Sequence, residues 1–175
     1  MKLTGSKLHR AMAMMCGLAL ALSFTACGDG EDEDGPDDPT PKPTKVLVSY
    51  SVKLSQAYYD NFDITVTNDI SGSQDITTDW YLAEEYNWDE APKTVSLKVV
   101  AMPKTTTPEF DHSKSYIFDC DCEVKAAVYD SNDNVIGTPT SAQALNSFVH
   151  NGSTAAVYCA SEVVLLDGSC NVTGK

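Results

Sequence analysis

Arginine is almost absent from this 175-residue chain, since its single copy is Arg10. After the first 26 residues the chain keeps nine lysines and all 25 acidic residues, which gives that part a formal charge of −16. Proteins bind nucleic acids and anionic lipids largely through arginine and lysine side chains. A chain of this composition is poorly suited to bind nucleic acids or anionic lipids, and we expect no nucleic-acid partner.

The residues and motifs of common enzymes are also scarce. Only His112 and His150 lie beyond the N-terminal leader, and neither a G-x-S-x-G motif nor a glycine-rich phosphate loop is present. The later cysteines form C-x-C and an eleven-residue spacing, whereas zinc ribbons and fingers use C-x2-C pairs. We therefore predict a protein without catalytic activity, cofactor or metal site.

No apolar run reaches the roughly 20 residues that a transmembrane helix needs. The longest apolar segment, 11–24, follows three basic residues and ends just before Cys27. A basic start, a short apolar run and small residues before a cysteine resemble the signal peptide and lipobox of a bacterial lipoprotein. The resemblance implies that residues 1–26 are removed and that Cys27 carries acyl chains such as palmitate. An ordinary signal peptide followed by an acidic linker is the alternative.

An acidic run follows Cys27 directly, and it resembles the export signal of surface-exposed lipoproteins in Bacteroidota-type bacteria. Its residues are Asp29, Glu31, Asp32, Glu33 and Asp34. The resemblance implies a protein in the outer membrane, held by its N-terminal lipid and exposed on the cell surface. Residues 27–44 contain seven acidic residues and four prolines, which predicts an extended, disordered linker between lipid and domain.

The remaining residues, 45–175, are enough for one domain with a single hydrophobic core. Apolar and polar residues alternate in the segments 46–54, 62–66, 95–101 and 118–128. Such alternation is typical of strands with one buried and one solvated face, and several of them predict an antiparallel sheet structure. The predicted fold is mostly β, an antiparallel β-sandwich of Ig-like or Greek-key type, with one short helix.

The sequence predicts that helix in the segment that begins at Thr140. Thr140 and Gln143 have the spacing of a capping box, and Asn151-Gly152 is typical of a helix stop. Between them, apolar residues lie at helical spacing: Ala142, Leu145, Phe148 and Val149. The segment 154–166 alternates again, which predicts a returning strand.

Four cysteines follow the leader and the lipidation site: Cys120, Cys122, Cys159 and Cys170. An even number in an exported protein favours disulfides. Cys120 and Cys122 lie two apart on a predicted strand, with Cα atoms roughly 7 Å apart, which disfavours a bond between them. We therefore expect each to bond Cys159 or Cys170, with free buried thiols as the alternative.

Both tryptophans fall in one short aromatic segment, whose rings are Trp80, Tyr81, Tyr86 and Trp88. Flat rings among acidic and amide side chains are suited to a sugar, although the same rings can equally anchor a core. We expect a non-catalytic cell-surface lipoprotein that is a structural or assembly component of an outer-membrane or fimbria-like complex, with protein partners. A surface glycan-binding module that uses the Trp80–Trp88 cluster is the alternative.

Overall fold

The computed structural model describes residues 40–106 and 109–172. The predicted signal peptide, the lipidation site Cys27 and most of the acidic linker lie outside these residues. So do the predicted export-signal residues: Asp29, Glu31, Asp32, Glu33 and Asp34. The structure therefore concerns the β-domain, whose first strand begins at Lys45.

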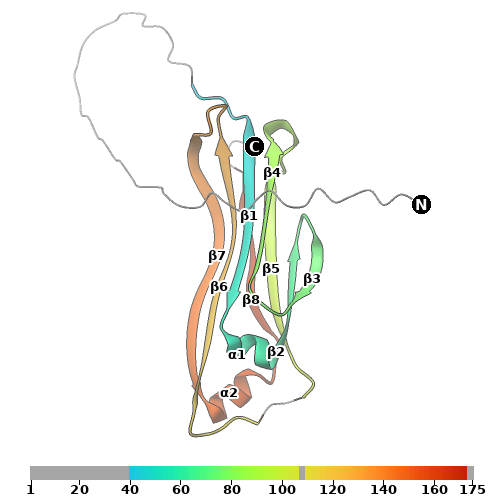
Figure 1. The fold of residues 1–175 in the computed structure, drawn as a ribbon, viewed down its shortest axis with the longest axis vertical. Coiled ribbons are helices and arrows are strands. Elements are labelled where there is room, and N and C mark those ends of the chain that lie inside the picture. Colours follow the sequence, from blue (N-terminus) through green and yellow to red (C-terminus); the bar gives the residue numbers. More distant parts are fainter. Residues whose placement is uncertain (1–39, 107–108, 173–175) are drawn as a thin grey trace, which may run out of the picture. The chain divides into compact units, whose positions relative to one another are not determined.

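Two antiparallel four-stranded sheets make up this domain, so the predicted β-sandwich class is confirmed (Figure 1). The first sheet has the order β4-β1-β6-β7, formed by Trp80–Asn87, Lys45–Leu54, Ser115–Tyr129 and Val135–Asn151. The second has the order β3-β2-β5-β8, formed by Gly72–Ile76, Phe62–Asn68, Thr94–Pro103 and Val163–Asn171.

The core lies between the sheets and is filled by the alternating apolar residues of the central strands. Val46, Val48, Tyr50 and Val52 of β1 are fully buried. In the second sheet, Val95, Leu97, Val99 and Ala101 of β5 are buried to the same degree. Because successive side chains of a strand point to opposite faces, the polar residues between them face solvent.

Two short α-helices of the described chain lie at the same end of the sandwich, α1 (Gln56–Asn61) and α2 (Gly152–Tyr158) (Figure 1). Their tyrosines meet, since the hydroxyls of Tyr58 and Tyr158 are 2.8 Å apart and hydrogen-bonded. The ring of Tyr58 packs edge-on against Phe118, with ring centroids 5.2 Å apart. These contacts close that end of the core, and the sequence analysis did not predict α1.

The predicted helix in segment 140–151 is wrong, because this segment is the second half of strand β7. Its residues satisfy both periods: the apolar positions follow a helical stripe, yet Thr140, Ala142 and Ala144 also occupy alternate positions, with Ser141 and Gln143 between them. The 15-residue strand β6 decides the outcome. It needs a hydrogen-bonding partner on each side, and β7 supplies one from Val135 to Asn151.

The predicted strand over 154–166 is also wrong in its first part, because Thr154 to Tyr158 belong to α2 and the strand begins at Val163. Asn151 starts this helix instead of stopping one: its side-chain oxygen accepts a hydrogen bond from the Thr154 N–H at 3.0 Å. Gly152 allows a close approach, since a Cβ atom there would lie 2.5 Å from the Asp111 carbonyl oxygen.

Candidate assembly surface

The predicted aromatic cluster is divided by the strand that carries it. Residues directly opposite each other in an antiparallel pair share a face. Trp80 pairs with the buried Val52 and Tyr86 with the buried Val46, so both rings lie on the inner face of β4. Trp80 packs against Tyr50, with ring centroids 6.4 Å apart. Both residues are half-buried and contact the core.

The other two rings have different surroundings. Tyr81 points to the outer face of β4 and is 58% exposed. Trp88 follows the end of β4 in a single 3-10 turn, Trp88–Glu90, and packs half-buried against the core. The structure therefore does not bring Trp80, Tyr81, Tyr86 and Trp88 onto one surface.

The predicted disulfides are absent, because Cys120, Cys122, Cys159 and Cys170 are all free and buried. Cys120 and Cys122 are neighbours on the inner face of β6, where the Cys120 thiol donates to the Ala144 carbonyl at 3.9 Å and the adjacent Cys122 thiol lowers the pKa of Cys120. The Cys170 thiol donates to the Val124 carbonyl at 3.9 Å. Burial raises the pKa of Cys159, at the end of α2, to about 11. These sulfurs are held by local hydrogen bonds and by packing.

A different feature distinguishes this domain: one of its exposed sheet edges is unprotected. An edge strand offers unpaired N–H and C=O groups, and proteins usually guard such strands with charge, proline, bulges or short length. Of the edge strands in the described residues, β4 carries Glu84 and Glu85 and β3 is five residues long. Edge strand β8 carries Asp167 and has a register irregularity opposite Val99 and Val100.

Strand β7 has little of this protection. None of its 17 residues is charged. Its irregularity, together with Gly137 and Pro139, falls in the first five residues, after which Thr140 to Asn151 pair with β6 without interruption. A regular stretch of twelve uncharged residues therefore lies at this sheet edge, and only its start is tied to the second sheet, where the Thr140 hydroxyl donates to the Asn171 carbonyl of β8.

The register shows which backbone groups of β7 face away from the sheet. The Ser55 N–H donates to the Asp119 carbonyl at 2.9 Å, so Asp119 of β6 directs its backbone groups toward β1. Successive residues alternate in this direction, so Cys120 bonds to β7, where it pairs with Asn146. In β7 the even-numbered residues thus bond to β6. The odd-numbered residues direct N–H and C=O to the open edge: Ser141, Gln143, Leu145, Ser147 and Val149.

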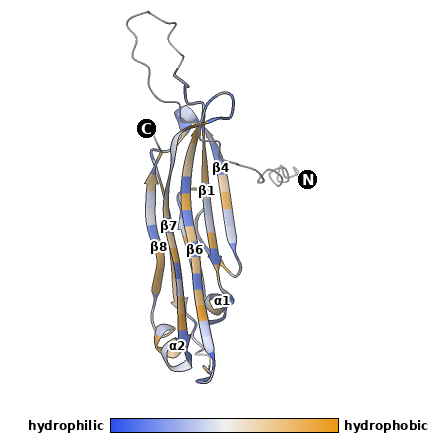
Figure 2. Ribbon diagram, turned by 90° about the vertical axis from the view of Figure 1, so that its left-hand side faces the viewer, coloured by the Kyte–Doolittle hydropathy of each residue, from blue (hydrophilic) through white to orange (hydrophobic). Residues whose placement is uncertain are grey.

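Apolar side chains accompany this open edge. Leu145 and Val149 point to the outer face and are 71% and 66% exposed. On the inner face Phe148 is 44% exposed, and its ring lies beside Tyr158 of α2, with ring centroids 6.2 Å apart. Figure 2 views the domain from the side on which β7 and β8 lie. We call the segment Thr140–Asn151 the β7 edge.

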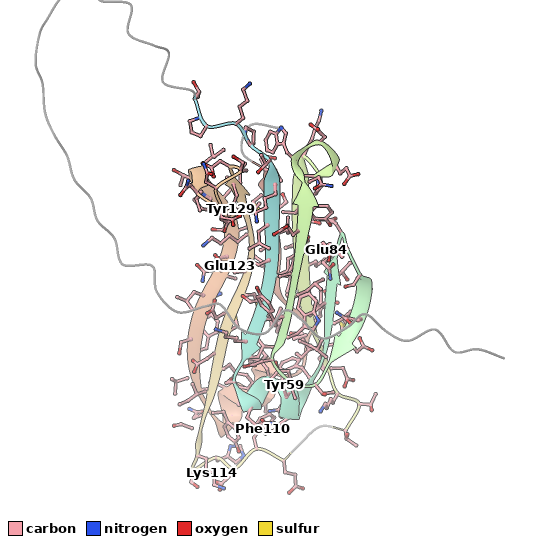
Figure 3. The ribbon with its side chains drawn as sticks, turned by 45° about the horizontal axis from the view of Figure 1, so that its top comes forward. Tyr59, Glu84, Phe110, Lys114, Glu123 and Tyr129 are labelled. Atoms are coloured by element: carbon pink, nitrogen blue, oxygen red, sulfur yellow. The ribbon has the colours of Figure 1, made fainter. Side chains whose placement is uncertain are left out.

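Acidic side chains line the neighbouring strand. Asp119, Asp121 and Glu123 lie on the outer face of β6, where Gln143 donates a hydrogen bond to Asp121 at 3.0 Å and Ser147 donates to Asp119. Figure 3 labels Glu123 on β6 and Glu84 on β4, the strands on either side of β1. The uncharged β7 edge is therefore bordered by a negatively charged column.

In the described part of the chain, no helix is long and apolar enough to cross a membrane, and no three metal-binding side chains come together. Comparisons with protein-family models, with curated proteins and with solved structures gave no match. Sequence reasoning missed the β7 edge because it assigned that segment to a helix.

Proposed function

We propose that this protein is a non-catalytic cell-surface lipoprotein that serves as a structural or assembly component of an outer-membrane or fimbria-like complex. The observation that carries the proposal is the β7 edge, which combines unpaired backbone groups, exposed apolar side chains and no charge. Addition of a strand to an open sheet edge is a common mode of protein assembly, in which main-chain hydrogen bonds supply affinity.

The contrast with the rest of the molecule supports this role. The chain has a formal charge of −13, and its other edge strands carry acidic residues or are short. A strongly charged protein stays soluble and separate. An uncharged edge in such a protein concentrates association at one place, as expected of an assembly component.

The N-terminal features supply the location. A lipid on Cys27 holds the protein at the membrane, and the acidic run that follows directs it to the cell surface. Cys27→Ser is expected to release the protein from the membrane fraction once the leader is removed, because no segment after the leader is apolar enough to hold it. Sedimentation of this variant with membranes, after a wash that removes peripheral proteins, would count against the lipid anchor.

The assembly role is tested by the size of the native complex in mild detergent. Leu145→Lys places a charge on the β7 edge, so we expect the complex to dissociate into smaller species. Val157→Lys is the matched control, since Val157 on α2 is 75% exposed and gains the same charge. A complex of unchanged size in Leu145→Lys, or one lost equally in both variants, would refute the role of the β7 edge.

A further inference from the structure

We infer that the strand which occupies the β7 edge is β7 of a second copy of this chain. The two strands run antiparallel about a twofold axis that passes beside Ser147. This inference rests on the proposed function, in which the β7 edge is the assembly surface, and it names the partner. The pairing joins the two β4-β1-β6-β7 sheets into one continuous sheet.

The first argument is that the other edges of the chain are unsuitable partners. A head-to-tail contact would need a second open edge on each copy, such as β3, β4 or β8. Strand β3 is short, β4 carries acidic residues, and β8 carries an acidic residue and has an irregular register. An assembly with one open edge per copy closes as an isologous pair, because the same surface serves both copies.

The chain's own N-terminal linker is also unsuitable. Residues 27–44 contain seven acidic residues and prolines at positions 36, 39, 41 and 43. Proline cannot donate to a β-ladder. The acidic residues would also approach the negative column of Asp119, Asp121 and Glu123 on β6. A second β7 brings neither problem.

Electrostatics permits the pairing despite the negative charge of both copies. In the joined sheet the acidic columns of the two β6 strands are separated by both β7 strands, which is three interstrand spacings or roughly 14 Å. The Debye length at physiological salt is about 8 Å. Repulsion between the columns is therefore largely screened, and the uncharged β7 edge acts as a spacer between them.

The axis at Ser147 follows from matching side chains along the edge. The twofold axis of an antiparallel pair can pass through a hydrogen-bonded pair of odd-numbered residues or through an even-numbered pair without hydrogen bonds, and the side chains of the outer face select Ser147 among these positions. With Ser147 there, Leu145 lies opposite Val149 of the second copy, and the symmetry repeats this contact. Gln143 then lies opposite Asn151 of the second copy. On the outer face apolar residues thus face apolar ones and polar residues face polar ones, whereas on the inner face Asn146 lies opposite Phe148 of the second copy.

Disulfide trapping of the full chain in its membrane tests this register. Ser147→Cys places two thiols opposite each other on the axis, with Cα atoms about 5.5 Å apart, within reach of a disulfide. We expect a covalent dimer on mild oxidation. Ser141→Cys is the matched control, on the same strand and face, and its mate is roughly 40 Å away. The control is expected to stay uncrosslinked.

The outcomes separate this inference from the proposed function. If Ser147→Cys gives no covalent dimer, self-pairing is wrong. If Leu145→Lys nevertheless still disrupts the membrane complex, the assembly role of the β7 edge remains intact. Crosslinking of Ser141→Cys in place of Ser147→Cys overturns the register. The pairing is supported if Ser147→Cys gives a covalent dimer that is lost when Leu145→Lys is added and is kept when Val157→Lys is added instead.

Discussion

At the scale of single residues, strand alternation separates four rings that adjoin in sequence. Trp80 and Tyr86 face the core, Trp88 packs against it after the strand ends, and Tyr81 alone is largely exposed. A sugar-binding platform would need several rings on one surface. The arrangement favours a structural role for Trp88, and this role has a measurable consequence.

Trp88→Ala is expected to lower the free energy of unfolding by about 2–3 kcal/mol, somewhat less than truncation of a fully buried tryptophan. Tyr81→Ala, the control on the same segment, is expected to change it by less than about 0.5 kcal/mol. Thermal or denaturant unfolding of both variants provides the comparison. An unchanged stability of Trp88→Ala, together with loss of a glycan-induced fluorescence response, would favour the glycan-binding alternative.

The cysteines illustrate what spacing alone can predict. Their number and the export signal favoured disulfides, yet each thiol is buried and free. The C-x-C spacing did place Cys120 and Cys122 on one face of one strand, as alternation requires. Which sulfurs approach each other depends on how strands from distant parts of the chain pack, and a single sequence does not contain that information.

At the scale of elements, the regular alternation of β1, β2, β5 and β6 was sufficient to predict these strands. The β7 segment was not predictable in the same way, because its apolar residues Ala142, Leu145 and Phe148 have helical spacing although the segment forms a strand. Long-range pairing with β6 resolves the ambiguity. The Asn151-Gly152 pair was misread for a related reason, since asparagine suits both ends of a helix.

Proline substitution distinguishes the two faces of the β7 backbone. Asn146→Pro removes an N–H that bonds to β6, so we expect the free energy of unfolding to fall by about 1–3 kcal/mol. Ser147→Pro removes an N–H at the open edge, where proline is tolerated, and we expect a smaller loss. A helix over 140–151 would be broken by both. Equal destabilisation of the two variants in denaturant unfolding would contradict the strand assignment.

At the scale of the whole molecule, charge and edge protection are unevenly distributed. The chain carries a large negative charge, and its acidic residues border the β7 edge without entering it. Under the proposed function, this distribution directs association to β7. In the proposed function, the lipid on Cys27 attaches the protein to the membrane and the β7 edge attaches it to a partner.

Amide hydrogen exchange along β7, resolved by residue, tests the central claim most directly. In the assembled native protein we expect slow exchange at the odd-numbered residues Gln143, Leu145, Ser147 and Val149, because a partner strand covers their N–H groups. In the Leu145→Lys protein these amides should exchange rapidly, apart from the substituted position, which is excluded. The even-numbered amides from Ala144 to Phe148 should stay protected in both. Rapid exchange at the odd-numbered residues of the assembled protein would contradict the account.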